Sequence, residues 1–241
     1  MIALIHKLYR MLFCRGGHGV HSPFVFDLIT TVIEEQHPYY CYDRLYPVRL
    51  QLMQCPNYKM KRILDNYCFT EDENRLLFRL ANRFKPETIF VIGSAFGLTP
   101  LYVTAFSKDT SCVVVEPDTS IAAIADEYLK KFALASVVVR DSLTDVPERL
   151  DFIVWDVSFI SFYREELIFS MQGFERFLDY VHDDSVMVIS GINSSRENRR
   201  VWKEICAHPG VTVTVDFYRF GVVFFNSKLY RKTYKNVVLC T

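Results

Sequence analysis

The 241-residue sequence lacks a net charge, since 28 Lys and Arg residues balance 28 Asp and Glu residues. A neutral chain has no long-range field that would attract nucleic acid, so a general DNA or RNA binder is not expected. The sequence also lacks an apolar run long enough to span a bilayer, because His6, Lys7 and Arg10 interrupt its apolar start. Segment 1–13 predicts an amphipathic helix instead, which packs either on the protein's own core or on a membrane surface.

The seven cysteines form no CxxC pair and show no metal-ligand spacing. Their odd number and wide scatter favour reduced thiols, which are typical of a cytoplasmic protein. Internal repeats and low-complexity tracts are also absent. The length and the 50% hydrophobic content predict one globular unit with a full core.

The sequence pattern changes character near residue 85. Before that point it is helical and aromatic, with apolar residues at helical spacing in Leu28–Glu35 and Asn74–Phe84. Thr70 and Glu73 resemble a capping box, and Ser22-Pro23 is interpreted as a break between segments. We expect an N-terminal helical extension or cap over residues 1–69 and an α/β domain over residues 70–241.

After Pro86, short β-branched runs alternate with stretches long enough for crossover helices. The expected strands are 88–92, 112–115, 137–139, 152–155 and 186–189, and the expected helices are 98–107, 119–132, 162–181 and 195–207. This alternation predicts a Rossmann-like, doubly wound, mostly parallel sheet covered on both faces. Residues 211–217 and 221–225 are separated by only three residues, so they predict an antiparallel hairpin at the sheet edge.

A glycine-containing turn follows the first expected strand, and an acid follows the second. In an open parallel sheet, ligands bind at the carboxyl ends of the strands. Gly93 and Gly97 allow the backbone to approach a ligand closely, and the Glu116 carboxylate can accept both hydroxyls of a ribose. Residues 87–116 therefore predict the nucleotide-cofactor half of an α/β domain.

Two common nucleotide motifs do not fit this turn. Ala95 and Leu98 occupy the places of the second and third glycines of G-x-G-x-x-G, so NAD fits poorly and an NAD-dependent enzyme is the weaker alternative. No Gly-Lys-Ser/Thr follows, which excludes a Walker loop.

Four motifs in order resemble class I S-adenosylmethionine-dependent methyltransferases, and within them the small O-methyltransferase branch. They are VIGSAFGLT at 91–99, VVEP at 114–117, DS at 141–142 and DFIVWD at 151–156. Segments 19–26 and 202–225 look like a bacterial group of that branch. The resemblance covers most of the chain and assigns residues 70–241 to a methyltransferase-like domain.

The resemblance implies S-adenosylmethionine as cofactor and a small-molecule methyl acceptor. It places the turn of Gly93, Ser94, Ala95 and Gly97 around the amino-acid part of the cofactor. Glu116 would hold the ribose, and Asp141 with Ser142 would lie near the adenine. Asp156 would lie beside the sulfonium and the acceptor, as the catalytic residue. The alternative is a purely structural role, in which Asp156 only caps the next helix.

Three departures from the family pattern bear on activity. Val91 replaces an acid, Ala95 replaces a glycine, and Ser190-Gly191 stands where metal-dependent relatives have ligands. One carboxylate, Asp156, makes a poor divalent site, so no catalytic metal is expected. The departures also motivate a second hypothesis, a catalytically degenerate binding or interaction protein. The sequence leaves open the acceptor, the role of segment 16–24 and the choice between monomer and homodimer.

Overall fold

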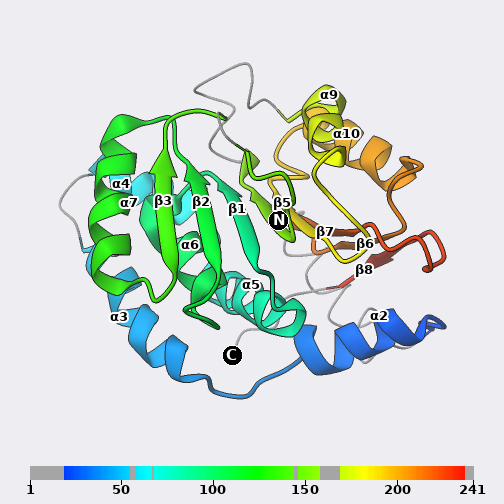
Figure 1. The fold of residues 1–241 in the computed structure, drawn as a ribbon, viewed down its shortest axis with the longest axis horizontal. Coiled ribbons are helices and arrows are strands. Elements are labelled where there is room, and N and C mark those ends of the chain that lie inside the picture. The colour runs from blue at the N-terminus through cyan, green and yellow to red at the C-terminus, as the bar shows by residue number, and fades with distance from the viewer. Residues whose placement is uncertain (1–18, 55–57, 67, 144–145, 158–168, 237–241) are drawn as a thin grey trace.

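A computed structural model describes residues 19–54, 58–66, 68–143, 146–157 and 169–236. The helix expected over residues 1–13 and the first part of the helix expected over 162–181 lie outside these ranges. Figure 1 shows one twisted sheet with helices packed against it. No helix of the described ranges is long and apolar enough to cross a membrane.

The helices and strands follow the alternation expected from the sequence. The helical elements are α2 (Pro23–Leu28), the π-helix η1 (Ile29–Ile33), α3 (Tyr40–Met53), α4 (Tyr58–Asn66), α5 (Glu71–Phe84), the 3₁₀ turn η2 (Ala95–Gly97), α6 (Leu98–Thr104), α7 (Thr119–Phe132), α9 (Met171–Leu178) and α10 (Arg196–Ala207). The strands are β1 (Thr88–Ile92), β2 (Ser111–Val115), β3 (Ser136–Arg140), β4 (Phe152–Trp155), β5 (Val186–Ser190), β6 (Val213–Asp216), β7 (Phe220–Phe224) and β8 (Lys232–Lys235).

The eight strands form one sheet in the order β3-β2-β1-β4-β5-β7-β6-β8. Strands β1 to β5 pair in parallel, and β7 pairs antiparallel with both β5 and β6. The predicted doubly wound sheet and its hairpin are therefore confirmed. The hairpin's position at the sheet edge was wrong, because β8 pairs in parallel with β6 and lies outside it. Strand β8 has the sequence KTYK, and such a polar segment carries no apolar run that would predict a strand.

The hairpin turn between β6 and β7 depends on one acid. Tyr218 adopts a left-handed backbone with φ of 73°, which side chains disfavour. The Asp216 Oδ1 atom accepts a hydrogen bond of 2.7 Å from the Tyr218 N–H, and Asp216 Oδ2 accepts one of 3.3 Å from the indole of Trp202. Asp216 thus holds the turn and ties it to α10.

The sheet has a separate apolar core on each face. On one face, the alternate residues of β1, β2, β4 and β5 pack with α2, η1 and α5. On the other face, the intervening residues pack with α9 and α10. A third cluster joins α3 and α4 to η2, α6 and α7. That third cluster brings the N-terminal helices to the turn that follows β1.

The first described helix begins where the sequence predicted a break. Ser22 is the N-cap of α2, and Pro23 occupies its first turn, where a proline loses no hydrogen bond. The helix continues into the π-helix η1 instead of starting at Leu28. The buried Arg79 donates to the carbonyl of Val32 at 2.7 Å and to that of Ile33 at 3.3 Å, which satisfies the end of the π-helix.

The capping box at the start of α5 is confirmed. The Thr70 hydroxyl accepts from the Glu73 N–H, and the Glu73 carboxylate accepts from the Thr70 N–H at 2.8 Å. The same carboxylate pairs with Arg219 at 3.1 Å. One acid therefore both caps α5 and binds the β6–β7 turn to it.

The connection from β3 to β4 differs from the others. Its described residues, 141–143 and 146–151, contain no helix. The face of β3 that a crossover helix would cover is correspondingly open, and Val138 is 47% exposed there.

We predict that Gly221→Ala lowers the free energy of unfolding by about 3 kcal/mol. A Cβ at this position in β7 would lie 2.2 Å from the Cη2 atom of the buried Trp202, so the indole or the strand must move. Chemical denaturation measures the loss. The matched control is Gly210→Ala, whose Cβ would lie 3.3 Å from the His208 ring, and it should change stability by less than about 1 kcal/mol. Equal losses in the two variants would contradict this packing account.

Candidate functional site

The turn between β1 and α6 adopts an unusual backbone. Gly93 and Gly97 have φ of 89° and 92°, and Ala95 and Phe96 have φ of 47° and 59°. Residues with a Cβ rarely adopt this region, at a cost of roughly 1–2 kcal/mol each. Surrounding contacts must therefore hold the turn in place. Helix α6 begins directly after it at Leu98, as the sequence predicted.

Gly97 is required for a second reason. A Cβ built on it would lie 3.3 Å from the backbone oxygen of Ala125 in α7. The glycine thus lets the turn pack closely against α7, in addition to allowing the positive φ.

The Glu116 carboxylate at the end of β2 is the main polar contact of the turn. Its Oε2 atom accepts hydrogen bonds from the N–H and the hydroxyl of Ser94, at 2.9 and 2.8 Å. Its Oε1 atom accepts one of 3.2 Å from the Asp118 N–H. Burial of the side chain, which is 1% exposed, raises the pKa of Glu116, although the donors from Ser94 and Asp118 favour the ionised form and oppose this shift.

A second acid, Asp156, follows β4. The Ser190 hydroxyl at the end of the neighbouring strand β5 donates a short hydrogen bond to its Oδ1 atom. Asp156 is 2% exposed, and it lines the same small cavity as Glu116. The carboxyl ends of β1, β2 and β4 thus bring a strained turn and two buried acids together.

The cavity enclosed by these groups is small, about 10 Å³. A space of this size holds about one water molecule. Its lining residues come from the strand ends and from the third apolar cluster: Ile63, Cys68, Gly93, Ala95, Phe96, Glu116, Ile121 and Asp156. Burial raises the pKa of the Cys68 thiol, and the nearby Asp156 carboxylate adds to the effect, so the thiol is neutral and behaves as an apolar group.

Three side chains fix the backbone that carries Cys68. Arg219 donates to the Cys68 carbonyl at 3.1 Å, and the buried Arg49 donates to the Phe69 carbonyl at 2.9 Å. Asn74 donates to the same Phe69 carbonyl at 3.3 Å. The wall opposite the glycine turn is therefore held by contacts from α3, α5 and the β6–β7 turn.

The predicted site residues do not all meet at this cavity. Four of them line the cavity: Gly93, Ala95, Glu116 and Asp156. Ser94 does not line it but donates a hydrogen bond to Glu116, and Gly97 packs the turn against α7. Asp141 and Ser142 follow β3 and do not line it; they form a 3.1 Å hydrogen bond with each other. Their role near an adenine stays a prediction.

Sequence reasoning missed two features of this site. The Thr99 hydroxyl in the first turn of α6 is buried and has no hydrogen-bond partner among the described residues. Its position two residues after Gly97 was the available signal. The other feature is the contribution of Ile63 and Cys68, which no local pattern reveals because they reach the turn through tertiary packing.

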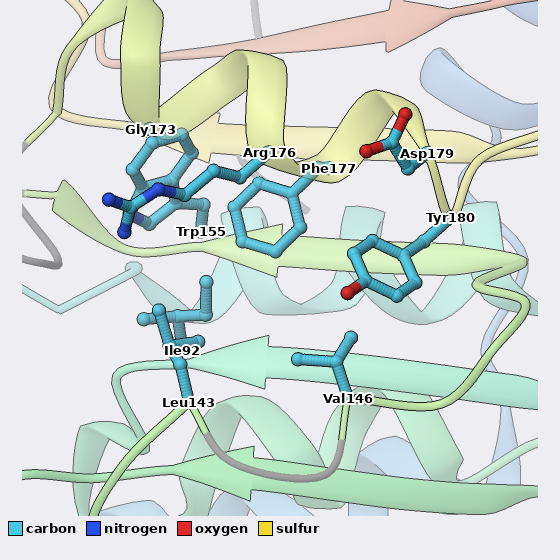
Figure 2. A pocket seen from close by; sticks show the side chains of 9 residues that line it. All are labelled: Ile92, Leu143, Val146, Trp155, Gly173, Arg176, Phe177, Asp179 and Tyr180. Atoms are coloured by element: carbon cyan, nitrogen blue, oxygen red, sulfur yellow. The ribbon is translucent and has the colours of Figure 1, made fainter.

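A larger cavity of about 270 Å³ lies beneath α9, on the face of the sheet that packs with α9 and α10 (Figure 2). It shares no lining residue with the small cavity. Two of its lining residues, Ile92 and Trp155, directly precede Gly93 and Asp156 in the chain.

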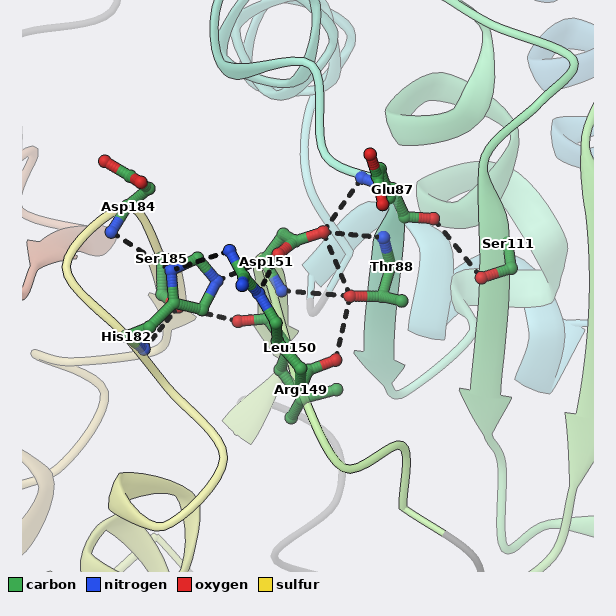
Figure 3. Close-up of polar contacts among 9 residues, drawn as sticks. All are labelled: Glu87, Thr88, Ser111, Arg149, Leu150, Asp151, His182, Asp184 and Ser185. Carbon is green, nitrogen blue, oxygen red and sulfur yellow. Dashed lines mark hydrogen bonds and ion pairs between the residues drawn. The ribbon is translucent and has the colours of Figure 1, made fainter.

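A polar cluster around Asp151 lies at the amino ends of the strands, away from the cavity at Glu116 (Figure 3). The Asp151 Oδ2 atom accepts hydrogen bonds from the N–H groups of Glu87 and Thr88, both at 2.9 Å, and from the Thr88 hydroxyl at 3.1 Å. Its Oδ1 atom lies 2.8 Å from Nε2 of His182, which precedes β5. The cluster joins the starts of β1, β4 and β5, so its role is structural.

No family model and no curated protein sequence matches the chain. Solved structures do match its fold. The methyltransferase PaMTH1 of Podospora anserina, solved with SAH (S-adenosylhomocysteine), has a TM-score of 0.58 and 11% identity, over 85% of this chain and 96% of that one. The O-methyltransferase TomG of Streptomyces achromogenes, solved with SAM (S-adenosylmethionine), has a TM-score of 0.55 and 15% identity, over 85% of this chain and 95% of that one.

A third match is the O-methyltransferase of Bacillus cereus, in complex with SAH. It has a TM-score of 0.52 and 16% identity, over 83% of this chain and 97% of that one. At such identities the likeness shows the fold alone: this chain shares its Rossmann-like fold with these three methyltransferases.

We predict that Asp151→Asn lowers the free energy of unfolding by about 2 kcal/mol at neutral pH. The amide cannot accept all the hydrogen bonds that the Asp151 carboxylate accepts from Glu87 and Thr88. Burial alone would raise the pKa of Asp151, but hydrogen bonds from Thr88, His182 and Glu87 outweigh it and lower the pKa. A lowered pKa stabilises the fold above the unfolded value of about 3.9, and this stabilisation is lost as the pH falls through the folded value.

The difference between the Asp151→Asn and parent proteins should therefore shrink as the pH is lowered below about 4 in denaturation experiments. The control is Asp109→Asn, in an exposed loop, which should change stability by no more than about 0.5 kcal/mol at any pH. A loss that stays constant into acid would contradict the proposed charge dependence.

Proposed function

We propose that this chain is an S-adenosylmethionine-dependent methyltransferase that acts in the cytoplasm on a small-molecule acceptor and uses no metal ion. The carrying observation is the buried Glu116 carboxylate at the tip of β2, bonded to the glycine turn at the tip of β1. In an open α/β sheet, these two tips form the usual site for a nucleoside cofactor. The fold shared with SAM-bound and SAH-bound methyltransferases supports the same cofactor.

The polar groups present match the parts of such a cofactor. Glu116 can accept the ribose hydroxyls through Oε1, while Oε2 keeps the turn in place. The unpartnered Thr99 hydroxyl and the backbone of the turn provide polar groups for the amino-acid part. We assign Asp141 and Ser142 to the adenine end because they follow β3, beside β2.

When bound, S-adenosylmethionine supplies an electrophilic methyl group. The chain's own contribution is then mainly to position an acceptor in line with that group and to exclude water. We assign to Asp156, which accepts a hydrogen bond from the Ser190 hydroxyl, the role of orienting an acceptor hydroxyl or amine. Asp156 and the Ser190 hydroxyl offer only one carboxylate, whereas Mg²⁺ prefers several oxygen ligands, which supports methyl transfer without a metal.

Cofactor binding requires the small cavity to enlarge. Small-molecule pockets usually measure roughly 300–1,000 Å³, far above the 10 Å³ found here. Ile63, Cys68 and Phe96 line the cavity together with Glu116, so their side chains must shift on binding.

The small size of this cavity also favours a second candidate function, a methyltransferase fold that has lost catalysis and serves as a binding or interaction protein. The replacement of the family's acid by Val91 points in the same direction. The two functions differ in turnover: transfer of a labelled methyl group to any acceptor in a small-molecule panel refutes the second, whereas cofactor binding without transfer supports it.

We predict that the purified chain binds SAH in calorimetric titration and that Glu116→Gln weakens binding at least about tenfold. The amide loses the charge that strengthens hydrogen bonds from the ribose hydroxyls. The control is Glu127→Gln, an exposed acid on α7, which should leave the affinity unchanged. Absence of SAH binding to the parent protein at millimolar concentration would refute the proposed cofactor, and equal affinities of parent and Glu116→Gln would refute the site.

Removal of divalent cations is expected to have no effect on the reaction. Treatment with EDTA should leave both the SAH affinity and any methyl transfer unchanged, because Asp156 and Ser190 do not make a competent divalent site. Restoration of lost activity by Mg²⁺ would show that this part of the proposal is wrong.

A further inference from the structure

Strand β3 forms one edge of the sheet, and its central part lacks the features that block the addition of a further strand. Figure 1 shows β3 at the end of the sheet, with β2 as its neighbour. Edge strands are commonly protected by lysines, prolines or β-bulges. The β3 sequence is SVVVR, so its three central residues are valines, and all five residues pair with β2 without a bulge. This edge is therefore open to strand pairing.

The outward backbone groups of β3 belong to Val137 and Val139. The Arg140 carbonyl accepts a hydrogen bond of 2.8 Å from the Glu116 N–H at the end of β2, so Arg140 faces β2. Successive residues of a strand direct their N–H and C=O groups to opposite sides. Val138 therefore also faces β2, whereas Val137 and Val139 face outward. Outside the ladder with β2, no backbone hydrogen bond between described residues involves either of these two valines.

The side chains of β3 leave one face of the strand open. Val137 and Val139 pack against the apolar cluster that contains α7. Val138 points to the opposite face, because side chains alternate along a strand. No helix occurs there among the described residues of the β3–β4 connection, and Val138 is 47% exposed. An apolar side chain at an unpaired edge is thus available to a partner strand.

We propose that two copies of this chain pair through β3, antiparallel and about a twofold axis at Val138. In this register Val137 of each copy lies opposite Val139 of the other, and both members of such a pair exchange their N–H and C=O hydrogen bonds. Val138 lies opposite its own counterpart, with the two Cα atoms about 4.5 Å apart. The two sheets become one continuous sheet. This interaction surface goes beyond the proposed methyltransferase function.

The residues of the strand favour a second copy as the occupant of this edge. Pairing centred on Val138 is self-complementary, as a contact between identical subunits about a twofold axis must be. It places Arg140, the charged residue of β3, opposite the neutral Ser136 of the other copy. Like charges opposite each other in a strand pair are destabilising, and this register has none.

The charges that flank the strand are also complementary. Lys131 lies at the end of α7, shortly before β3, and Asp141 directly follows β3; both are exposed. Neither side chain forms an ion pair with another described residue. Antiparallel pairing brings the start of each β3 toward the end of the other, so Lys131 of one copy approaches Asp141 of its partner. Attraction between these ends supports the same orientation.

The test measures the mass of the chain in solution by analytical ultracentrifugation, without ligand, so that its outcome does not depend on the cofactor. The parent protein should be a dimer at micromolar concentration. Val138→Lys should weaken dimerisation at least about tenfold, because two lysines then meet at the twofold axis. The matched control is Leu50→Lys on α3, where the replaced side chain is 39% exposed, and it should leave the dimer intact. A monomeric parent, or a Val138→Lys protein as dimeric as the parent, overturns the proposal.

Mixing opposite charges tests the register. Val138→Glu alone should dissociate as Val138→Lys does, whereas equal amounts of the two variants should form a mixed dimer. This rescue requires residue 138 of one copy to meet residue 138 of the other, and it also shows that both variants are folded. The neutral, β-branched Val138→Thr should remain dimeric. A mixture of the two charged variants that stays monomeric refutes pairing at Val138.

Hydrogen exchange provides a readout at the backbone itself. The amides of Val137 and Val139 should exchange at least about tenfold more slowly in the parent dimer than in Val138→Lys, because they gain acceptors from the other copy. The Val138 amide faces β2 in both proteins and serves as the internal control. Equal exchange of Val137 and Val139 in the two proteins would show that the copies do not meet at β3.

Discussion

The hydrogen bonds between Glu116 and Ser94 are the constraint on which the candidate site depends. They join the end of β2 to a turn in which Ala95 and Phe96 occupy backbone conformations that side chains disfavour. With the turn held in this shape, α6 can begin at Leu98 and Gly97 can pack against α7. The same carboxylate is buried and faces the small cavity, so one side chain both shapes the turn and presents the acceptor that a ribose would need.

The turn also explains why the cavity is closed. Its conformation directs Phe96 into the apolar cluster formed with α3 and α4, and Ile63 and Cys68 approach from the other side. The N-terminal helices are therefore part of the site's wall. A ligand at Glu116 competes with this apolar packing, and its affinity must depend on how easily α4 and the Cys68 backbone yield. Arg49 and Arg219 hold that backbone from two directions.

Local patterns predicted those parts of the fold that local physics determines. The five parallel strands were predicted to within about one residue at each end because their β-branched runs are nearly continuous, and the capping box at Thr70 is a short-range motif. The π-helix was missed because Arg79, far away in the sequence, satisfies its last carbonyls. Gly93 and Glu116 were found from their places after strands, whereas the contributions of Ile63 and Cys68 depend on tertiary packing. The division into residues 1–69 and 70–241 stays a prediction.

Strand β8 has a consequence for how this molecule meets its own copies. An edge strand presents unpaired backbone groups on which another chain can extend the sheet, and proteins often block such extension with lysines. In β8, Lys232 and Lys235 begin and end a four-residue strand, and both are exposed. A second copy approaching this edge would bring its own lysines against them, and the strand is too short to offset that repulsion. The C-terminal edge is thereby protected from aggregation through continued strand pairing.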